Sequence, residues 1–131
     1  EQGLRSGGMG LMADWVKYLA QDWGHWMRKA DKKGAALSGT LGRIQEQGLD
    51  GAAIRGYVDT IPIIEFPLDI KKFHLAWKKL EPQFQNIIFL DFRIKNVNHK
   101  DKFRALGLKK DAYYRRRRQS LDAIARSMAL G

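Results

Sequence analysis

Apolar positions recur at helical spacing in the first third of the chain. The aromatic and aliphatic residues of segment 11–31 are separated by four, four and three positions, at Trp15, Leu19, Trp23 and Trp26. This spacing predicts a helix with these side chains along one face, packed in the core. The same face is widened by Val16, Ala20 and Met27. A base-stacking platform for single-stranded nucleic acid is the alternative. Gly24 weakens such a helix, and we expect another helix to pass close to it, between Trp23 and Trp26.

The middle of the chain has a weaker pattern. Residues 32–57 are rich in glycine and predict one short helix around residues 37–49 and a second from about Asp50 to Tyr57. Two prolines in segment 59–68 favour extended backbone, so we expect a linker between an N-terminal helical region (11–58) and a C-terminal region (69–131). A short strand is the alternative for this segment.

Helical periodicity returns after the linker. Asp69 is a candidate N-cap for a helix to about Leu80, and Pro82 suits the first turn of the next helix, which ends near Lys95. Two further helices are expected at 100–106 and 109–130. The pattern therefore predicts an all-α protein of six or seven helices.

Composition adds a partner class. The chain has 131 residues, of which 44% are hydrophobic, enough for a packed core, and its formal net charge is +10. An excess of this size is typical of proteins that bind nucleic acid or an acidic membrane surface. A generally basic protein with no such partner is the alternative. The cluster of arginines at 115–118 argues against it.

Several kinds of site are disfavoured. The absence of cysteine excludes disulfides, zinc ribbons and thiol catalysis, and three scattered histidines predict no metal or cofactor. No apolar run approaches the roughly 20 residues that span a bilayer. Residues 1–10 lack a signal-peptide core, so we expect a mobile end and a cytoplasmic protein. The carboxylates show no catalytic spacing, so we expect no enzyme; they include Glu65, Asp69, Glu81 and Asp91.

The last third of the chain joins a short helix, a glycine and a long basic helix. In a helix-turn-helix the first helix supports the second, and a tight turn containing glycine joins them. Gly107 fits that turn. The long helix would turn a set of residues to the core: Tyr113, Leu121, Ile124, Ala125 and Met128. A solvated face on an ordinary helical bundle is the alternative, as is a basic cluster of the nuclear-localisation type.

The opposite face of the long helix holds the candidate DNA-binding residues. At three- and four-residue spacing it presents Lys110, Asp111, Tyr114, Arg115 and Arg118. Arginine can bond bidentately to guanine, a contact worth ~1–3 kcal/mol of discrimination between bases. Contacts to phosphates, which position a protein without specifying sequence, are expected from Lys109, Arg116 and Arg117. These residues predict double-stranded DNA as the partner.

A sequence motif precedes the predicted helix-turn-helix. The sequence L-x-P-x-x-x-x-I-I is formed by Leu80, Pro82, Ile87 and Ile88, ahead of the supported basic helix. Segment 73–128 thereby resembles the four-helix domain of bacterial sigma factors that reads the −35 promoter element. The resemblance implies a sigma-domain-4-like helix-turn-helix in the C-terminal half. It places Lys110, Asp111 and Tyr114 where such domains present base-reading side chains.

A second set of landmarks covers more of the chain. A W-G-x-W motif at Trp23, Gly24 and Trp26 is followed by the glycine-rich stretch and the C-terminal unit. Over residues 13–128 this order is similar to the late-gene antitermination Q proteins of lambdoid phages, although the zinc-binding cysteines of some relatives are absent. The resemblance implies binding to DNA near a late promoter, capture of paused bacterial RNA polymerase with sigma factor, and read-through of terminators. The N-terminal helices would then face polymerase or nascent RNA.

The expected function is therefore DNA-binding transcription regulation, in the specific form of phage late-gene antitermination. A conventional helix-turn-helix repressor or activator needs the same recognition helix. A non-catalytic helical phage protein that binds a protein partner would share the fold. Both alternatives stay open. Binding to a membrane surface is also compatible with a basic amphipathic last helix, but the apolar stripe of that helix is one that the supporting helix can cover.

Overall fold

A computed structural model describes the backbone of residues 2–31, 51–94 and 97–130, and the side chains from residue 14 to residue 129 within those ranges. The elements are α1 (Gln2–Ala30), α3 (Gly51–Asp59), α4 (Leu68–Lys78), α5 (Pro82–Ile88), the π-helix η1 (Phe89–Arg93), α6 (His99–Leu106) and α7 (Lys110–Leu130). No strand occurs in these ranges, which confirms the all-α prediction. The short helix predicted around 37–49 lies outside the described residues.

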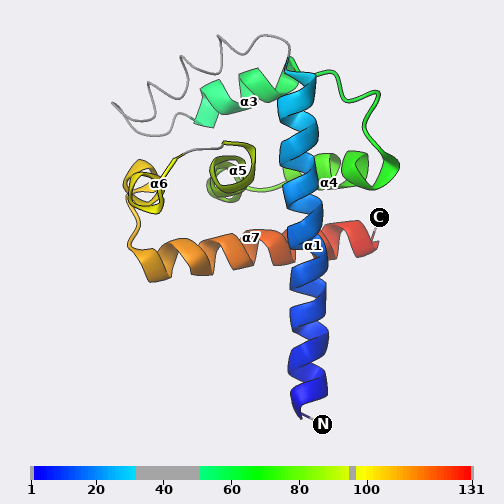
Figure 1. The fold of residues 1–131 in the computed structure, drawn as a ribbon, viewed down its shortest axis with the longest axis vertical. Coiled ribbons are helices and arrows are strands. Elements are labelled where there is room, and N and C mark those ends of the chain that lie inside the picture. The colour runs from blue at the N-terminus through cyan, green and yellow to red at the C-terminus, as the bar shows by residue number, and fades with distance from the viewer. Residues whose placement is uncertain (1, 32–50, 95–96, 131) are drawn as a thin grey trace.

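The two long helices, α1 and α7, cross each other (Figure 1). α5 lies between α3 and α7, and α4 and η1 also pack against α1. Residues from both sides of segment 59–68 belong to one buried cluster, and the segment itself contributes Ile61 and Phe66 to it. The segment predicted as a linker therefore packs into a single core that the N-terminal and C-terminal regions share.

Helix α1 differs from its prediction at its start and in the exposure of Trp15. It begins at Gln2 rather than at residue 11, and its N-terminal part projects beyond α7 (Figure 1). Trp23 is fully buried, as predicted, but Trp15 is 49% exposed. The buried stripe is Val16, Leu19, Ala20, Trp23 and Met27. All five were predicted for this face; Trp15 falls outside it and Trp26 is only half-buried, because α4, η1 and α7 together define the side of α1 that is covered.

Gly24 confirms the predicted close approach of another helix. A β-carbon at this position would lie 2.1 Å from the carbonyl oxygen of Phe92, a backbone atom of η1. Two non-bonded atoms cannot lie this close, so any larger residue would push the backbone of η1 away. Only glycine lets η1 pack on α1 at this point. The glycine therefore has a packing role in addition to its cost in helix propensity.

The helices after residue 67 begin close to their predicted positions. α4 begins at Leu68 with Pro67 at the N-cap, so the N-cap prediction for Asp69 is wrong by two residues. The Asp69 carboxylate instead accepts a hydrogen bond from the backbone N–H of Ile70, at 2.8 Å. Pro82 occupies the first turn of α5, as predicted, and α5 continues into η1, which ends when Ile94 becomes extended. Proline suits that first turn because its missing N–H has no partner there anyway.

A buried hydrogen bond joins α1 to α4. Trp23 Nε1 donates to His74 Nδ1 at 3.0 Å, and the His74 side chain is enclosed by Phe66, Trp23 and Trp77. Burial, followed by the charge of Lys78, lowers the pKa of His74 to about 4. The neutral ring is the form that can accept from Trp23, so the folded protein holds His74 unprotonated.

Because the pKa of His74 is lowered by folding, we expect the protein to lose stability in acid. Unfolded His74 takes up a proton near pH 6.5, whereas folded His74 does so only near pH 4. Between these values the unfolded state binds the extra proton, so this site lowers the free energy of unfolding by up to ~1.4 kcal/mol per pH unit of acidification. Urea titrations from pH 7 to pH 4 should show this slope, and His74→Gln should flatten it. An equal slope in His74→Gln and the exposed-site control His25→Gln would contradict the assignment.

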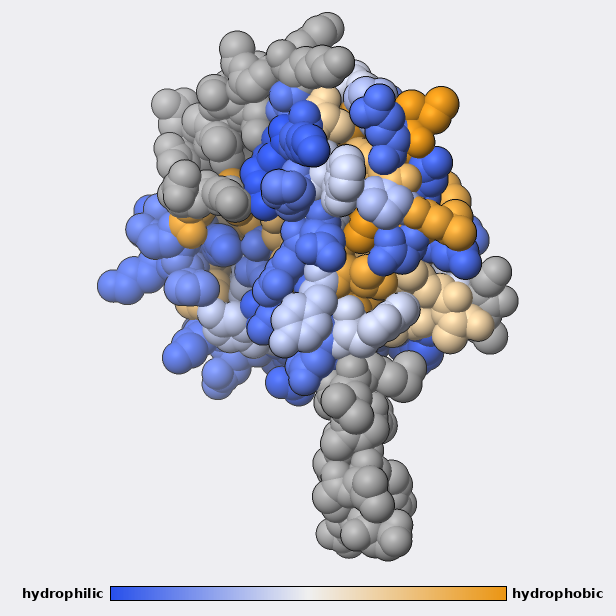
Figure 2. Space-filling model, turned by 45° about the vertical axis from the view of Figure 1, so that its right-hand side comes forward, coloured by the Kyte–Doolittle hydropathy of each residue, from blue (hydrophilic) through white to orange (hydrophobic). Residues whose placement is uncertain are grey.

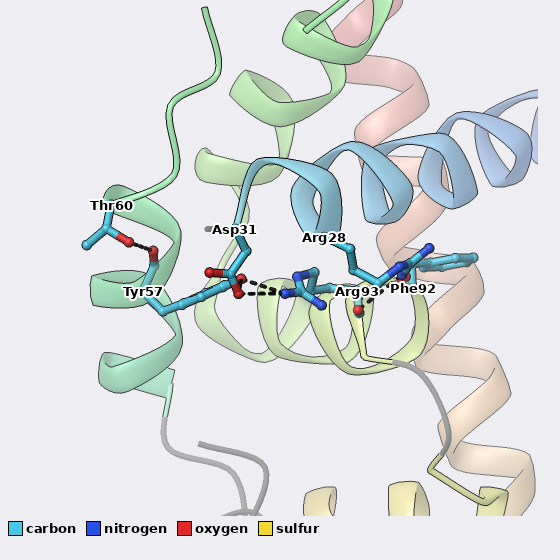
Figure 3. Close-up of polar contacts among 6 residues, drawn as sticks. All are labelled: Arg28, Asp31, Tyr57, Thr60, Phe92 and Arg93. Carbon is cyan, nitrogen blue, oxygen red and sulfur yellow. Dashed lines mark hydrogen bonds and ion pairs between the residues drawn. The ribbon is translucent and has the colours of Figure 1, made fainter. Parts of the chain in front are cut away.

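A second polar cluster fixes the end of α1 (Figure 3). Arg93 pairs with Asp31 at 3.1 Å and donates to the hydroxyl of Tyr57, which in turn donates to Asp31 at 2.7 Å. Burial and the hydrogen bond to Asp31 raise the pKa of Tyr57 to about 12. The cluster connects α1, α3 and η1. It thereby fixes the position of η1, which precedes the helix pair α6 and α7.

Candidate nucleic-acid interface

Helix α6, a short turn and α7 occupy the positions where the sequence predicted a supporting helix, a glycine turn and a basic helix. Asn98 caps α6, its side-chain oxygen accepting from the backbone N–H of Asp101 at 2.8 Å. Gly107 ends α6 in the left-handed conformation, with φ of 65°. The N–H groups of Gly107 and Leu108 bond back to the carbonyls of Arg104 and Phe103, the pattern of a Schellman turn. The turn is therefore specified by local sequence.

Aromatic contacts hold α6 against α7. The ring of Phe103 lies 5.0 Å from that of Tyr113 and 5.9 Å from that of Tyr114, measured between centroids. The hydroxyl of Tyr114 lies 3.2 Å from His99 Nδ1, which adds a polar contact at the start of α6. Tyr114 was predicted to face DNA, but the structure places it half-buried between the two helices.

Asp91 of η1 anchors both helices of the unit. Its oxygen Oδ1 accepts from the hydroxyl of Tyr113 at 2.7 Å and lies 3.5 Å from Lys102 Nζ, and Oδ2 accepts from Arg117 Nη1 at 3.0 Å. Burial and the neighbouring Asp91 charge raise the pKa of Tyr113 above its usual value, so its hydroxyl stays a donor. One carboxylate thus fixes α6 through Lys102 and α7 at two points. Sequence reasoning missed this role for Asp91.

The predicted DNA-binding residues fall into two groups. Most of them are exposed: Lys109, Lys110, Asp111, Arg115 and Arg118. The others are half-buried, and among them is Arg116, which was expected to contact phosphate. Arg117 differs, because its guanidinium pairs with Asp91 and lies over the ring of Tyr114, 4.9 Å from the centroid. Arg117 therefore points toward Asp91 of η1. A DNA phosphate on the exposed face of α7 could not reach it, contrary to the prediction.

The exposed side of the unit is basic, and its two central arginines are available. Among the described residues, neither Arg115 nor Arg118 makes an ion pair or a side-chain hydrogen bond. Two exposed cations on α6, Lys100 and Arg104, add to the same unit, although Arg104 lies 3.8 Å from the Asp101 carboxylate. The predicted set did not include these two, even though both belong to the basic sequence of the supporting helix.

The opposite face of α7 is buried, as the sequence predicted. Tyr113, Leu121, Ile124 and Ala125 belong to the core, and Met128 packs against it. Since one side of α7 is fixed by the core and by Asp91, the other side is a rigid helical surface. Such a surface has the dimensions that enter a major groove.

Other sites find no support in the part of the chain that is described. No group of three or more His, Asp or Glu side chains there is placed to hold a metal ion. No helix in these ranges is long and apolar enough to cross a membrane. No protein-family model, curated protein or solved structure matches the chain.

Proposed function

We propose that this protein is a transcription regulator that binds double-stranded DNA through α6 and α7. The observation that supports this most strongly is the pair Arg115 and Arg118, exposed and unpaired among the described residues on a helix whose other face is buried. Guanidinium groups in this setting can bond to guanine edges or to phosphates. The exposed lysines at the start of α7, Lys109 and Lys110, would add phosphate contacts.

The specific form that we propose is late-gene antitermination, with bacterial RNA polymerase and sigma factor as protein partners and nascent RNA as a further contact. This step rests on the resemblance of residues 13–128 to the Q proteins of lambdoid phages and of residues 73–128 to the sigma-factor domain. The helix-turn-helix would load the protein on DNA, and the remainder of the molecule would engage the polymerase.

In vitro transcription through a terminator tests the proposal. On a template carrying a late promoter of the lambdoid type, the protein should increase read-through, and Arg115→Ala/Arg118→Ala should lose the effect. Arg126→Ala is a suitable control because it removes another exposed arginine of the same helix, about two turns further on. Altered initiation without read-through would instead identify a conventional activator or repressor.

A protein-binding function is the second candidate, and one surface favours it. Figure 2 shows apolar residues reaching the surface among hydrophilic ones. The large apolar side chains that are exposed on and just before α4 are Ile64 (79%), Leu68 (68%) and Leu75 (53%). Leu68 and Leu75 lie about two turns apart on the same side of α4, and exposed apolar groups that share a surface favour a protein contact. If Leu68→Ser/Leu75→Ser abolished read-through while DNA binding persisted, this surface would be the polymerase contact.

A further inference from the structure

A concave surface lies where α1, η1 and α7 meet, on the side of α7 that packs against η1. Its volume is about 340 Å³, and its lining includes the cationic side chains of Lys17, Arg28 and Arg117. Asp91, Phe92 and Ile94 of η1 and its C-cap form another part of the wall. The volume falls within the range of small-molecule sites.

Positive charge is in excess in this cavity. Among the residues that the structure describes, the one carboxylate that lines it, Asp91, is already paired with Lys102 and Arg117. Arg28 therefore faces a region without a free counter-charge among the described residues. Burial, followed by the charge of Arg93, lowers the pKa of Arg28, which is the direction expected for a partly desolvated cation near a second cation.

The two guanidinium groups are held in place before any ligand arrives. Arg28 Nη1 donates to the carbonyl oxygens of Phe92 at 2.8 Å and Arg93 at 3.1 Å (Figure 3). Arg117 is held by Asp91 and by the ring of Tyr114. A guanidinium has five N–H donors, so each keeps donors for a ligand, and fixed donors lose little conformational entropy on binding.

Lys17 completes the group. Its side chain is half-buried, and among the described residues it has no ion pair or hydrogen bond. The flexible ammonium can move to a ligand that the two arginines have oriented.

We propose that this cavity binds the phosphate group of a small phosphomonoester of nucleotide size, with Lys17, Arg28 and Arg117 around the phosphate. A dianionic phosphate matches the excess charge, and planar guanidinium groups bond phosphate oxygens bidentately. The rest of the ligand lies along the wall formed by Phe92 and Ile94. The proposal does not depend on DNA binding by α7, because the cavity is lined by Arg117 and by neither Arg115 nor Arg118.

NMR titration of the full chain with inorganic phosphate and with adenosine monophosphate, at constant ionic strength set with chloride, tests this site. Both probes should bind saturably, with the nucleotide tighter. Gln21 also lines the cavity, so Gln21→Glu places a negative charge beside the phosphate, and Lys17→Gln removes a positive one. Each should weaken binding at least tenfold; neither residue has a polar partner among the described residues, so the fold should persist. Lys72→Gln, an exposed lysine on α4, is the matched control and should leave affinity unchanged.

Three results would overturn the proposal. The first is the absence of saturable binding by either probe. The second is an equal loss of affinity in Lys17→Gln and Lys72→Gln, which would show attraction to net charge alone. The third is binding of a single-stranded oligonucleotide with no binding of phosphate or the mononucleotide, which would assign the surface to a polymer.

Discussion

Asp91→Ala is expected to destabilise the protein by about 3 kcal/mol, because it leaves two partly buried cations without their carboxylate. The Asp91 side chain is 7% exposed, and its partners Lys102 and Arg117 are 11% and 24% exposed. The substitution also removes the acceptor of the fully buried Tyr113 hydroxyl. An unsatisfied buried donor adds its own penalty to that of the unpaired charges. Urea unfolding followed by circular dichroism measures the loss.

Two further variants separate the contributions. Asp91→Asn keeps an acceptor for Tyr113 but removes the charge that faces Lys102 and Arg117, so its loss should lie between wild type and Asp91→Ala. Asp22→Ala removes an exposed carboxylate from α1 and should change stability by less than about 0.5 kcal/mol. If Asp91→Ala were as stable as Asp22→Ala, the anchoring role of Asp91 would be wrong.

Gly24→Ala is the second substitution expected to have a large effect. Its new β-carbon would meet the Phe92 carbonyl oxygen at 2.1 Å and the Phe92 carbonyl carbon at 2.8 Å, and neither atom belongs to a flexible side chain. Helix η1 must therefore move away from α1, and the hydrogen bonds from Arg28 to the end of η1 move with it. Overpacking of this kind costs about 3 kcal/mol, which outweighs the gain of about 1 kcal/mol in helix propensity.

Gly56 provides a control of opposite sign. It lies in α3, is exposed, and has no heavy atom within 4 Å of the position of an added β-carbon. Gly56→Ala should therefore stabilise the protein by about 0.5–1 kcal/mol through helix propensity alone. Thermal unfolding of the two variants should show shifts in opposite directions. A stabilised Gly24→Ala would mean that η1 does not pack on α1 at this point.

The start of α5 and the end of α6 were predictable from short-range signals in the sequence. Pro82 and Gly107 mark the start of α5 and the end of α6 because their backbone preferences act within one turn. Gly24 indicated a close helix contact, because glycine lowers the stability of a helix and is expected there only where another helix packs closely. The exposure of Trp15 was not predictable in this way, because the covered side of α1 is set by helices far away in sequence.

The candidate site was predictable in its position but only in part in its residues. Successive residues on a helix point about 100° apart, so four arginines in a row cannot all face DNA. At least one of Arg115, Arg116, Arg117 and Arg118 had to turn toward the core, and it is Arg117. Its partner Asp91 stands in an apolar run, where sequence alone does not indicate what it pairs with. Long-range pairing of this kind appears only in the folded structure.

Duplex binding by wild type and by Arg115→Ala/Arg118→Ala tests the central claim, the recognition role of α7, most directly. Fluorescence anisotropy with duplexes selected in vitro for binding to the protein should show at least a tenfold loss of affinity in the double variant. Lys72→Ala/Lys79→Ala removes the same charge from exposed positions on and beside α4 and should lose far less. If wild type neutralises about six phosphates, its affinity should fall ~1,000-fold between 50 and 200 mM salt. Equal losses in the two double variants, or a flat salt response, would contradict the account.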